Sequence, residues 1–205
     1  MEILRNLKTK KVIRTAGLMT GTSMDGLDIS IADIGLSNNT ADFNMIGTTS
    51  IPYPSDLQSQ VRQAVYDTTK NSSELDHDLG IWYAEKLSEY LQSESIDNIE
   101  LIGSHGQTIH HVSGQSTLQI GDPSYLAEKF NIPVISDFRT ADIRAGGTGA
   151  PLMPRVDEWL FRNIDTAIIT LNLGGVANVT FLPCTLSLIH ISEPTRRYAI
   201  SYAVF

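Results

Sequence analysis

The sequence predicts an α/β protein with two lobes, of which the second is only begun. Hydrophobic and polar residues alternate within the first fifty residues, a period that is typical of β-strands. Hydrophobic residues then recur at helical spacing from Leu57 to Leu91, so helices follow the strands. A further strand, glycine turn and strand start near Thr166, which indicates that a second lobe begins there.

The order of the elements follows from the same patterns. The first three strands form an antiparallel meander, because a polar turn at residues 37–40 separates the second strand from the third. Pro54 starts one helix, and Ser73 with Asp76 resembles a capping box for the next, whose aromatic residues are expected in the core. Strands are expected at 12–19, 27–34, 43–51, 99–103, 117–120, 132–135, 166–173 and 176–182, with later helices at 122–130 and 152–160.

Composition and charge exclude several classes of function. The net charge is −8 and the pI is about 5.0, so the chain lacks the basic surface that nucleic acid requires. No apolar run is long enough for a transmembrane helix. The single cysteine, Cys184, excludes an internal disulfide and a cysteine-based zinc site, which suits the cytoplasm.

A loop rich in small residues, 17–28, joins the first two strands and is typical of a hairpin that binds phosphate. Its glycines resemble half of a Walker A motif, but Leu27 stands where that motif has lysine, and a strand follows instead of a helix. Thr22, Ser23 and the backbone N–H groups can donate to phosphate oxygens, and Asp25 can hold a water on Mg²⁺. A glycine turn without a ligand is the alternative.

Two segments follow strands at the edge where α/β sheets place ligands. In the first, Gln107 and Thr108 suit the recognition of hydroxyl groups, and His105 is either a general base or, more simply, a turn residue held by hydrogen bonds. In the second, Arg139 suits a carboxylate or phosphate. The alternative for Arg139 is an ion pair with Asp137 or Asp142.

Two glycine-rich segments lie further along the chain. Residues 145–151 suit the wall of a sugar pocket, with a flexible connector as the alternative. Residues 172–178 form a second glycine hairpin, which could hold one nucleotide together with the first. The neighbours His110 and His111 face opposite ways on a strand and have no evident third ligand, so a metal site is rejected there.

Taken together, the segments 17–28, 103–108, 119–123, 137–139, 146–152 and 172–178 closely resemble the anhydro-N-acetylmuramic acid kinase family. The resemblance covers about residues 15–183. It implies the two-lobed, actin-like ATPase fold, which is ribonuclease H-like and is shared with hexokinase and Hsp70. It also implies a cytoplasmic, ATP- and Mg²⁺-dependent sugar kinase of peptidoglycan recycling that opens the 1,6-anhydro bond of its amino sugar and phosphorylates O6.

The resemblance also implies roles for particular residues. The nucleotide-binding residues would be Gly21, Thr22, Ser23, Met24, Asp25, Gly26, Leu27, Asp28, Gly174, Gly175 and Asn178, with Asp25 holding Mg²⁺ through water. The sugar-binding residues would be Gln107, Thr108, Arg139, Gly147 and Gly149, with Arg139 on the lactyl carboxylate. Thr148 stands where many relatives have glutamine. The partner would be a small amino sugar, not nucleic acid or membrane, and a homodimer is left open for the full-length protein.

The same resemblance divides the chain into a leader (1–14), an N-terminal lobe (15–140), the start of a second lobe (141–183) and a tail (184–205). The tail resembles translated sequencing-adapter DNA, with a lineage-specific strand pair as the alternative, since residues 200–205 have β composition. The catalytic aspartate of the family follows the matching region, so no catalytic residue is assigned and the chain as written is expected to be inactive. A kinase of another sugar, or a nucleotide-binding module without catalysis, are the competing functions.

Overall fold

The computed structural model describes residues 7, 9–37, 40–67, 72–161, 165–173, 176–184 and 189–194. The chain divides into two compact units, Met1–Ala150 and Pro151–Phe205. The expected border between lobes lies earlier, after residue 140.

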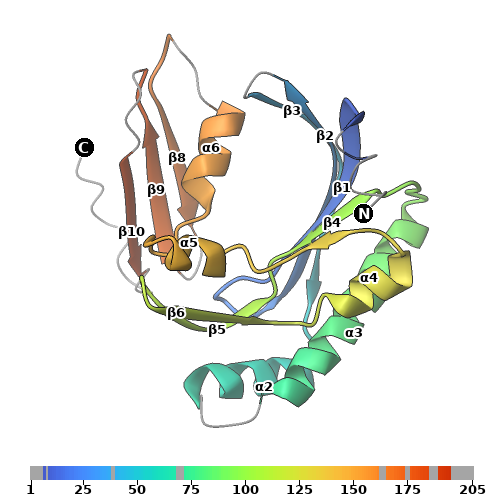
Figure 1. Cartoon of the computed structure of the whole chain (residues 1–205). Coiled ribbons are helices and arrows are strands. Elements are labelled where there is room, and N and C mark those ends of the chain that lie inside the picture. Colours follow the sequence, from blue (N-terminus) through green and yellow to red (C-terminus); the bar gives the residue numbers. More distant parts are fainter. Residues whose placement is uncertain are drawn as a thin grey trace. The chain divides into compact units, whose positions relative to one another are not determined.

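The first unit is built on a mixed five-stranded sheet (Figure 1). Its strands are β1 (Val12–Met19), β2 (Gly26–Ser37), β3 (Thr40–Pro52), β4 (Leu101–Ser104) and β7 (Val134–Ile135), in the order β3-β2-β1-β4-β7. β1, β2 and β3 are antiparallel neighbours, whereas β1, β4 and β7 run parallel. The predicted meander is therefore confirmed, and the strand order is the one that a ribonuclease H-like fold implies.

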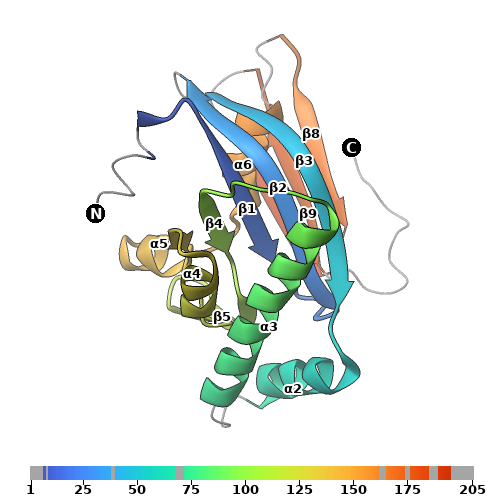
Figure 2. The ribbon, with the colours of Figure 1, turned by 90° about the vertical axis from the view of Figure 1, so that its right-hand side faces the viewer.

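The helices α3 (Ser73–Ser93) and α4 (Ser124–Phe130) pack on this sheet, and Figure 2 shows α3 in front of the strands. The helix α2 (Ser55–Tyr66) lies below the strands in that view and contributes Leu57 and Val61 to the core. The aromatic residues of α3 lie in the core as predicted, since Tyr83 is 1% exposed and Trp82 packs against Tyr53 with tilted rings whose centroids are 5.0 Å apart. Buried residues from β1, β2 and β4, such as Ile29 and Ile102, complete this core.

The capping box expected at the start of α3 is wrong. The helix begins at Ser73, so the residue at the N-cap position is Ser72. The Ser72 side chain makes no hydrogen bond that caps the helix. The Asp76 carboxylate instead accepts a hydrogen bond of 2.7 Å from the Gly121 N–H, and the Asp122 N–H donates to the Asp76 carbonyl. Asp76 therefore ties the chain before α4 to the first turn of α3.

Two smaller elements complete the first unit. A hairpin of β5 (Gln107–Val112) and β6 (Ser116–Ile120) follows β4, and the short helix α5 (Thr140–Arg144) follows β7. The helix α5 has five residues and was not predicted from the sequence. In the described part of the chain, no helix is both long and apolar enough to cross a bilayer.

The second unit contains α6 (Met153–Phe161) and an antiparallel sheet in the order β10-β9-β8. Its strands are β8 (Ile168–Leu173), β9 (Val176–Leu182) and β10 (Ile189–Pro194). β10 falls in the tail and pairs with β9, whereas residues 200–205 lie outside the described residues. Ile169, Leu171 and Leu173 of β8 are each at least 59% exposed, so one side of this strand is apolar and open.

Candidate functional site

Three segments of the first unit follow the carboxyl ends of parallel strands. Residues 20–25 follow β1, residues 105–106 follow β4 and residues 136–139 follow β7. Because these strands are parallel neighbours, the three segments lie at one edge of the sheet, where α/β proteins bind ligands. The edge brings together the first hairpin and the expected sugar-side residues.

The tip of the first hairpin is open to solvent. Thr22, Ser23 and Asp25 are exposed, and the Ser23 hydroxyl donates to the Asp25 carboxylate at 2.7 Å. Met24 adopts a left-handed conformation (φ 53°), and its N–H donates to the Gly21 carbonyl at 3.2 Å. A left-handed residue in a tight turn is a common element of backbone anion sites.

The base of the hairpin is packed tightly. A Cβ atom on Gly26 would overlap the carbonyl oxygen of Ile51, so this position requires glycine. Thr20 is 2% exposed and donates its hydroxyl hydrogen to the Gly106 carbonyl at 2.8 Å. The hairpin is therefore anchored to both β3 and the segment after β4.

The last two residues of the expected phosphate loop belong to β2. The Leu27 side chain is 1% exposed and lies in the core, so only its backbone can face a ligand. Asp28 is exposed, and its carboxylate accepts a 2.5 Å hydrogen bond from the Ser50 hydroxyl. The hairpin thus carries two exposed carboxylates, on Asp25 and Asp28.

Arg139 and His105 form the main charged cluster at this edge. Arg139 donates to His105 Nε2 from Nε (3.1 Å) and from Nη2 (2.8 Å), and its Nη1 donates to the Gly149 carbonyl at 2.8 Å. The other ring nitrogen of His105, Nδ1, lies 2.7 Å from the carbonyl of Gly106. A carbonyl only accepts and a guanidinium only donates, so His105 is neutral with its hydrogen on Nδ1.

The pKa values of His105 and Arg139 are both shifted by this environment. Burial and the nearby positive charge of Arg139 lower the pKa of His105 below its ordinary value. Burial also lowers the pKa of Arg139. His105 lacks a free lone pair at either ring nitrogen, so it orients Arg139 rather than acting as a base. The expectation of a histidine fixed in a turn matches this geometry.

Arg139 keeps unused hydrogen-bond donors. Three of its five N–H groups donate within the chain, which leaves one on each terminal nitrogen. In the ranges that the structure covers, no ion pair joins Arg139 to a carboxylate. The alternative of a pair with Asp137 or Asp142 is wrong, because Asp137 accepts from the Thr140 N–H and Asp142 bonds the glycine loop.

Asp142 shapes the glycine-rich segment that follows α5. Its carboxylate accepts from the Gly149 N–H at 2.7 Å, and its carbonyl accepts from the Gly147 N–H at 2.8 Å. A Cβ atom on Gly147 would overlap the Asp142 carboxylate, and Gly149 has a φ of 73°. The two glycines are therefore needed for the loop that presents the Gly149 carbonyl to Arg139.

Gln107 and Thr108 differ in their access to solvent. Gln107 is 0% exposed and its amide bonds Tyr53 and Gly21, so a direct sugar contact would require these bonds to open. Thr108 is partly exposed, and its hydroxyl accepts from Gln119 Nε2 at 3.2 Å. No local sequence pattern indicates the contact between Gln107 and Tyr53, which are 54 residues apart.

A cavity of about 280 Å³ lies beside this cluster. It is lined by His105, by the carboxylate residues Asp76 and Asp137, and by the hydroxyl residues Ser104 and Thr140. Ser104 is 2% exposed, and its hydroxyl has no hydrogen-bond partner among the residues described. Such a lining offers many acceptors and suits a ligand that is rich in hydroxyl or amide hydrogens.

The second glycine hairpin lies in the second unit. Gly174 and Gly175 fall outside the described residues, whereas Asn178 lies on β9 opposite Asn172. A cavity of about 260 Å³ in this unit is lined by Asn178 together with Asp157 and Thr170. The Thr170 hydroxyl donates to the buried Asp157 carboxylate at 2.7 Å.

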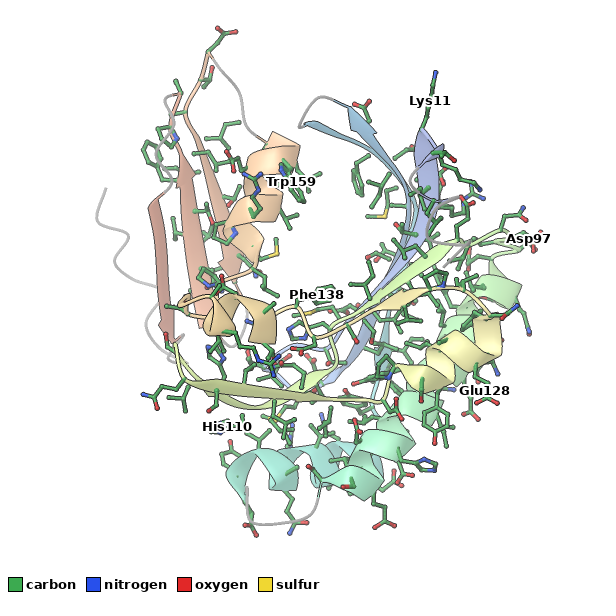
Figure 3. All side chains as sticks on the ribbon, viewed as in Figure 1. Lys11, Asp97, His110, Glu128, Phe138 and Trp159 are labelled. Atoms are coloured by element: carbon green, nitrogen blue, oxygen red, sulfur yellow. The ribbon has the colours of Figure 1, made fainter. Side chains whose placement is uncertain are left out.

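His110 and His111 lie on β5 and contact residues of β6, and His110 is labelled in Figure 3. His110 Nε2 lies 2.9 Å from the Ser116 hydroxyl and His111 Nδ1 lies 3.3 Å from that of Thr117. Among the described side chains, no three histidine, cysteine, aspartate or glutamate residues converge on a metal position.

Comparison with known proteins identifies the family. The family model for anhydro-N-acetylmuramic acid kinase matches residues 13–189. The chain belongs to this family. An anhydro-N-acetylmuramic acid kinase of Bacillus thuringiensis (strain Al Hakam) is 38% identical over 183 residues, which are 84% of this chain and 48% of that protein. One of Bacillus cereus (strain AH820) is 38% identical over 179 residues, 82% of this chain and 47% of that protein.

The chain therefore spans about half the length of these anhydro-N-acetylmuramic acid kinases. A solved hexokinase from Schistosoma mansoni in complex with glucose shares 10% identity over 83% of this chain and 36% of that chain, with a TM-score of 0.35. The family match includes both glycine hairpins and the Arg139 segment.

The neutral His105 makes the stability of this family member depend on pH. The pKa of His105 is lowered in the folded chain from its ordinary value of about 6.5. At a pH between these two pKa values, His105 takes up a proton in the unfolded chain but not in the folded chain. Stability should therefore fall as the pH drops from 7.5 to 5. Urea midpoints measured at these pH values should fall less steeply for His105→Gln, and parallel curves for the two chains would contradict the assignment.

Proposed function

We propose that the whole protein is an ATP-dependent kinase that converts 1,6-anhydro-N-acetylmuramic acid to N-acetylmuramic acid 6-phosphate in peptidoglycan recycling. The observation that carries the proposal is the guanidinium of Arg139, which has no carboxylate partner among the described residues and is hydrogen-bonded to His105, a residue that lines a cavity rich in acceptors. A muramic acid has both parts that such a site requires, a carboxylate for the guanidinium and hydroxyl and amide hydrogens for the acceptors.

The first hairpin is the proposed site for the ATP phosphates. Its exposed tip can donate from the backbone and from Thr22 and Ser23. Asp25 and Asp28 would repel phosphate by themselves, so a cation between them and the phosphates is required by charge. Mg²⁺ fits this donor set, because it binds through one or two carboxylates, the phosphates and water. Bound ATP would supply the transferable phosphoryl group.

The chain's own residues would act mainly by positioning and by electrostatics. Arg139, oriented by His105 and the Gly149 carbonyl, would hold the lactyl carboxylate. Thr108 and the loop of Gly147 and Gly149 would border the sugar. On the second hairpin, Gly174, Gly175 and Asn178 would hold phosphate oxygens. The attacking base is proposed to lie in the part of the family sequence that follows the matched region.

The test uses a full-length relative that carries this N-terminal half. Incubated with ATP, Mg²⁺ and 1,6-anhydro-N-acetylmuramic acid, it should form the 6-phosphate, which mass spectrometry detects as the added mass of one phosphoryl group from ATP and one water from the opening of the anhydro bond. A panel of other sugars serves as the control. Turnover of a different sugar at a higher rate, or no turnover by protein that binds ATP, would contradict the proposal.

A further inference from the structure

The side chain of Gln107 is buried beneath the first hairpin. It is 0% exposed. Its Nε2 lies 3.3 Å from the Gly21 carbonyl and 3.3 Å from the Thr108 carbonyl, and its Oε1 accepts a 3.2 Å hydrogen bond from the Tyr53 hydroxyl. The amide is therefore fully engaged between the hairpin and the core.

Two buried tyrosines fix the direction of these hydrogen bonds. The hydroxyl of Tyr53 lies 3.2 Å from that of Tyr83 on α3. Burial raises the pKa of Tyr53 and raises that of Tyr83 to about 12, so both hydroxyls keep their hydrogens. Since Tyr53 donates to Oε1 of Gln107, Tyr83 donates to Tyr53. The carbonyl oxygens of Gly21 and Thr108 can only accept, so the Nε2 group of Gln107 faces them, and a chain of donors runs from α3 to the hairpin.

The Gly21 carbonyl is the point at which this chain meets the turn. It also accepts the Met24 N–H at 3.2 Å, the hydrogen bond that closes the turn over Thr22 and Ser23. Gln58 Nε2 donates to the Met24 carbonyl at 2.9 Å and holds the other side of the turn. The turn of the exposed tip is therefore held by two side-chain amides, that of Gln107, which is buried, and that of Gln58, which is partly buried.

We propose that Gln107 is a positioning residue for the phosphate hairpin. It fixes the Gly21 carbonyl, and through it the turn to Met24, so that the tip is ordered before a ligand arrives. Ordering a binding loop in advance removes part of the entropy loss on binding. The inference rests on the proposed function for what the hairpin binds, but the ordering of the loop is measurable without nucleotide.

The test replaces Gln107 with methionine, which has similar length and no donor. Amide hydrogen exchange at residues 21–25 of the whole ligand-free chain should rise about 3- to 10-fold, the equivalent of one lost hydrogen bond. Exchange in the middle of α3 should not change. Calorimetry with Mg·ATP should show affinity weakened about 3- to 10-fold for the same reason.

Two further variants make the result specific. Gln119→Met removes an amide that bonds Thr108 and Thr117 and has no contact with the hairpin, so exchange at 21–25 should stay as in the native chain. Tyr53→Phe keeps Gln107 but removes the donor to its Oε1, and should raise exchange in the same direction by less. If Gln107→Met does not fold, amide exchange in Tyr53→Phe tests the positioning role instead.

The outcomes separate this inference from the proposed function. Unchanged exchange at residues 21–25 in both Gln107→Met and Tyr53→Phe would overturn the positioning role. If exchange rises in the variants but the native chain binds no Mg·ATP, the result would support positioning of the loop and contradict nucleotide binding at this hairpin. Raised exchange with weakened Mg·ATP binding supports both.

Discussion

Replacing Gly121 with alanine should destabilise the first unit by about 2 to 6 kcal/mol, the sum of a strained backbone and an overpacked core. Gly121 has a φ of 112°, which a residue with a Cβ atom rarely adopts. The added methyl group would also overlap Cε2 of Tyr83, which is 1% exposed. The loss is a large part of the total stability of a typical domain, about 5 to 15 kcal/mol.

A matched variant separates the two causes. Gly146 has a φ of 92°, but no atom lies within 4 Å of the position its Cβ would take, so Gly146→Ala should lose only the backbone contribution, about 1 to 3 kcal/mol. Urea unfolding followed by far-UV circular dichroism measures both. Equal losses in the two variants would show that Tyr83 moves aside at little cost.

Replacing Arg139 with glutamine should weaken binding of 1,6-anhydro-N-acetylmuramic acid about 10- to 150-fold, the effect of losing a hydrogen bond to a charged group. Arg139 is half-buried and lacks a carboxylate partner in the described part of the chain, so a ligand carboxylate would be its only opposite charge. Titration calorimetry on the whole chain measures the dissociation constant.

The matched sugar without the lactyl group, 1,6-anhydro-N-acetylglucosamine, isolates the carboxylate. The native chain should prefer the muramic acid, and Arg139→Gln should lose this preference. Arg144→Gln is the control for net charge, because Arg144 is exposed at the end of α5. A preference that survives in Arg139→Gln would assign the carboxylate to another group.

Much of the first unit was predictable because its signals are local. Alternation along β1 to β3 and the helical spacing of α3 gave the elements to within a few residues. The helix α5 was missed because five residues are too few to show a period. The site was predictable in its residue types, since loops after parallel strands carry polar groups.

The partners within the site were not predictable in the same way. The sequence offered Asp137 and Asp142 as neighbours for Arg139, whereas its actual partner is His105, 34 residues earlier. Likewise Gln107 suited a sugar by its chemistry, and only its burial under the hairpin indicates a different role. Such contacts depend on how β4 and β7 are brought side by side, which no local pattern encodes.

The parallel pairing of β1 with β4 bears on how the chain folds during its synthesis. Thr15 lies opposite Leu101, with two strands and two helices between them in sequence. Ribosomes add about 5 to 20 residues per second, so β1 has an open edge for roughly 4 to 16 seconds before β4 emerges. The backbone N–H and C=O groups of that edge are unpaired during this interval, which makes the nascent meander a target for chaperones and for association with other chains.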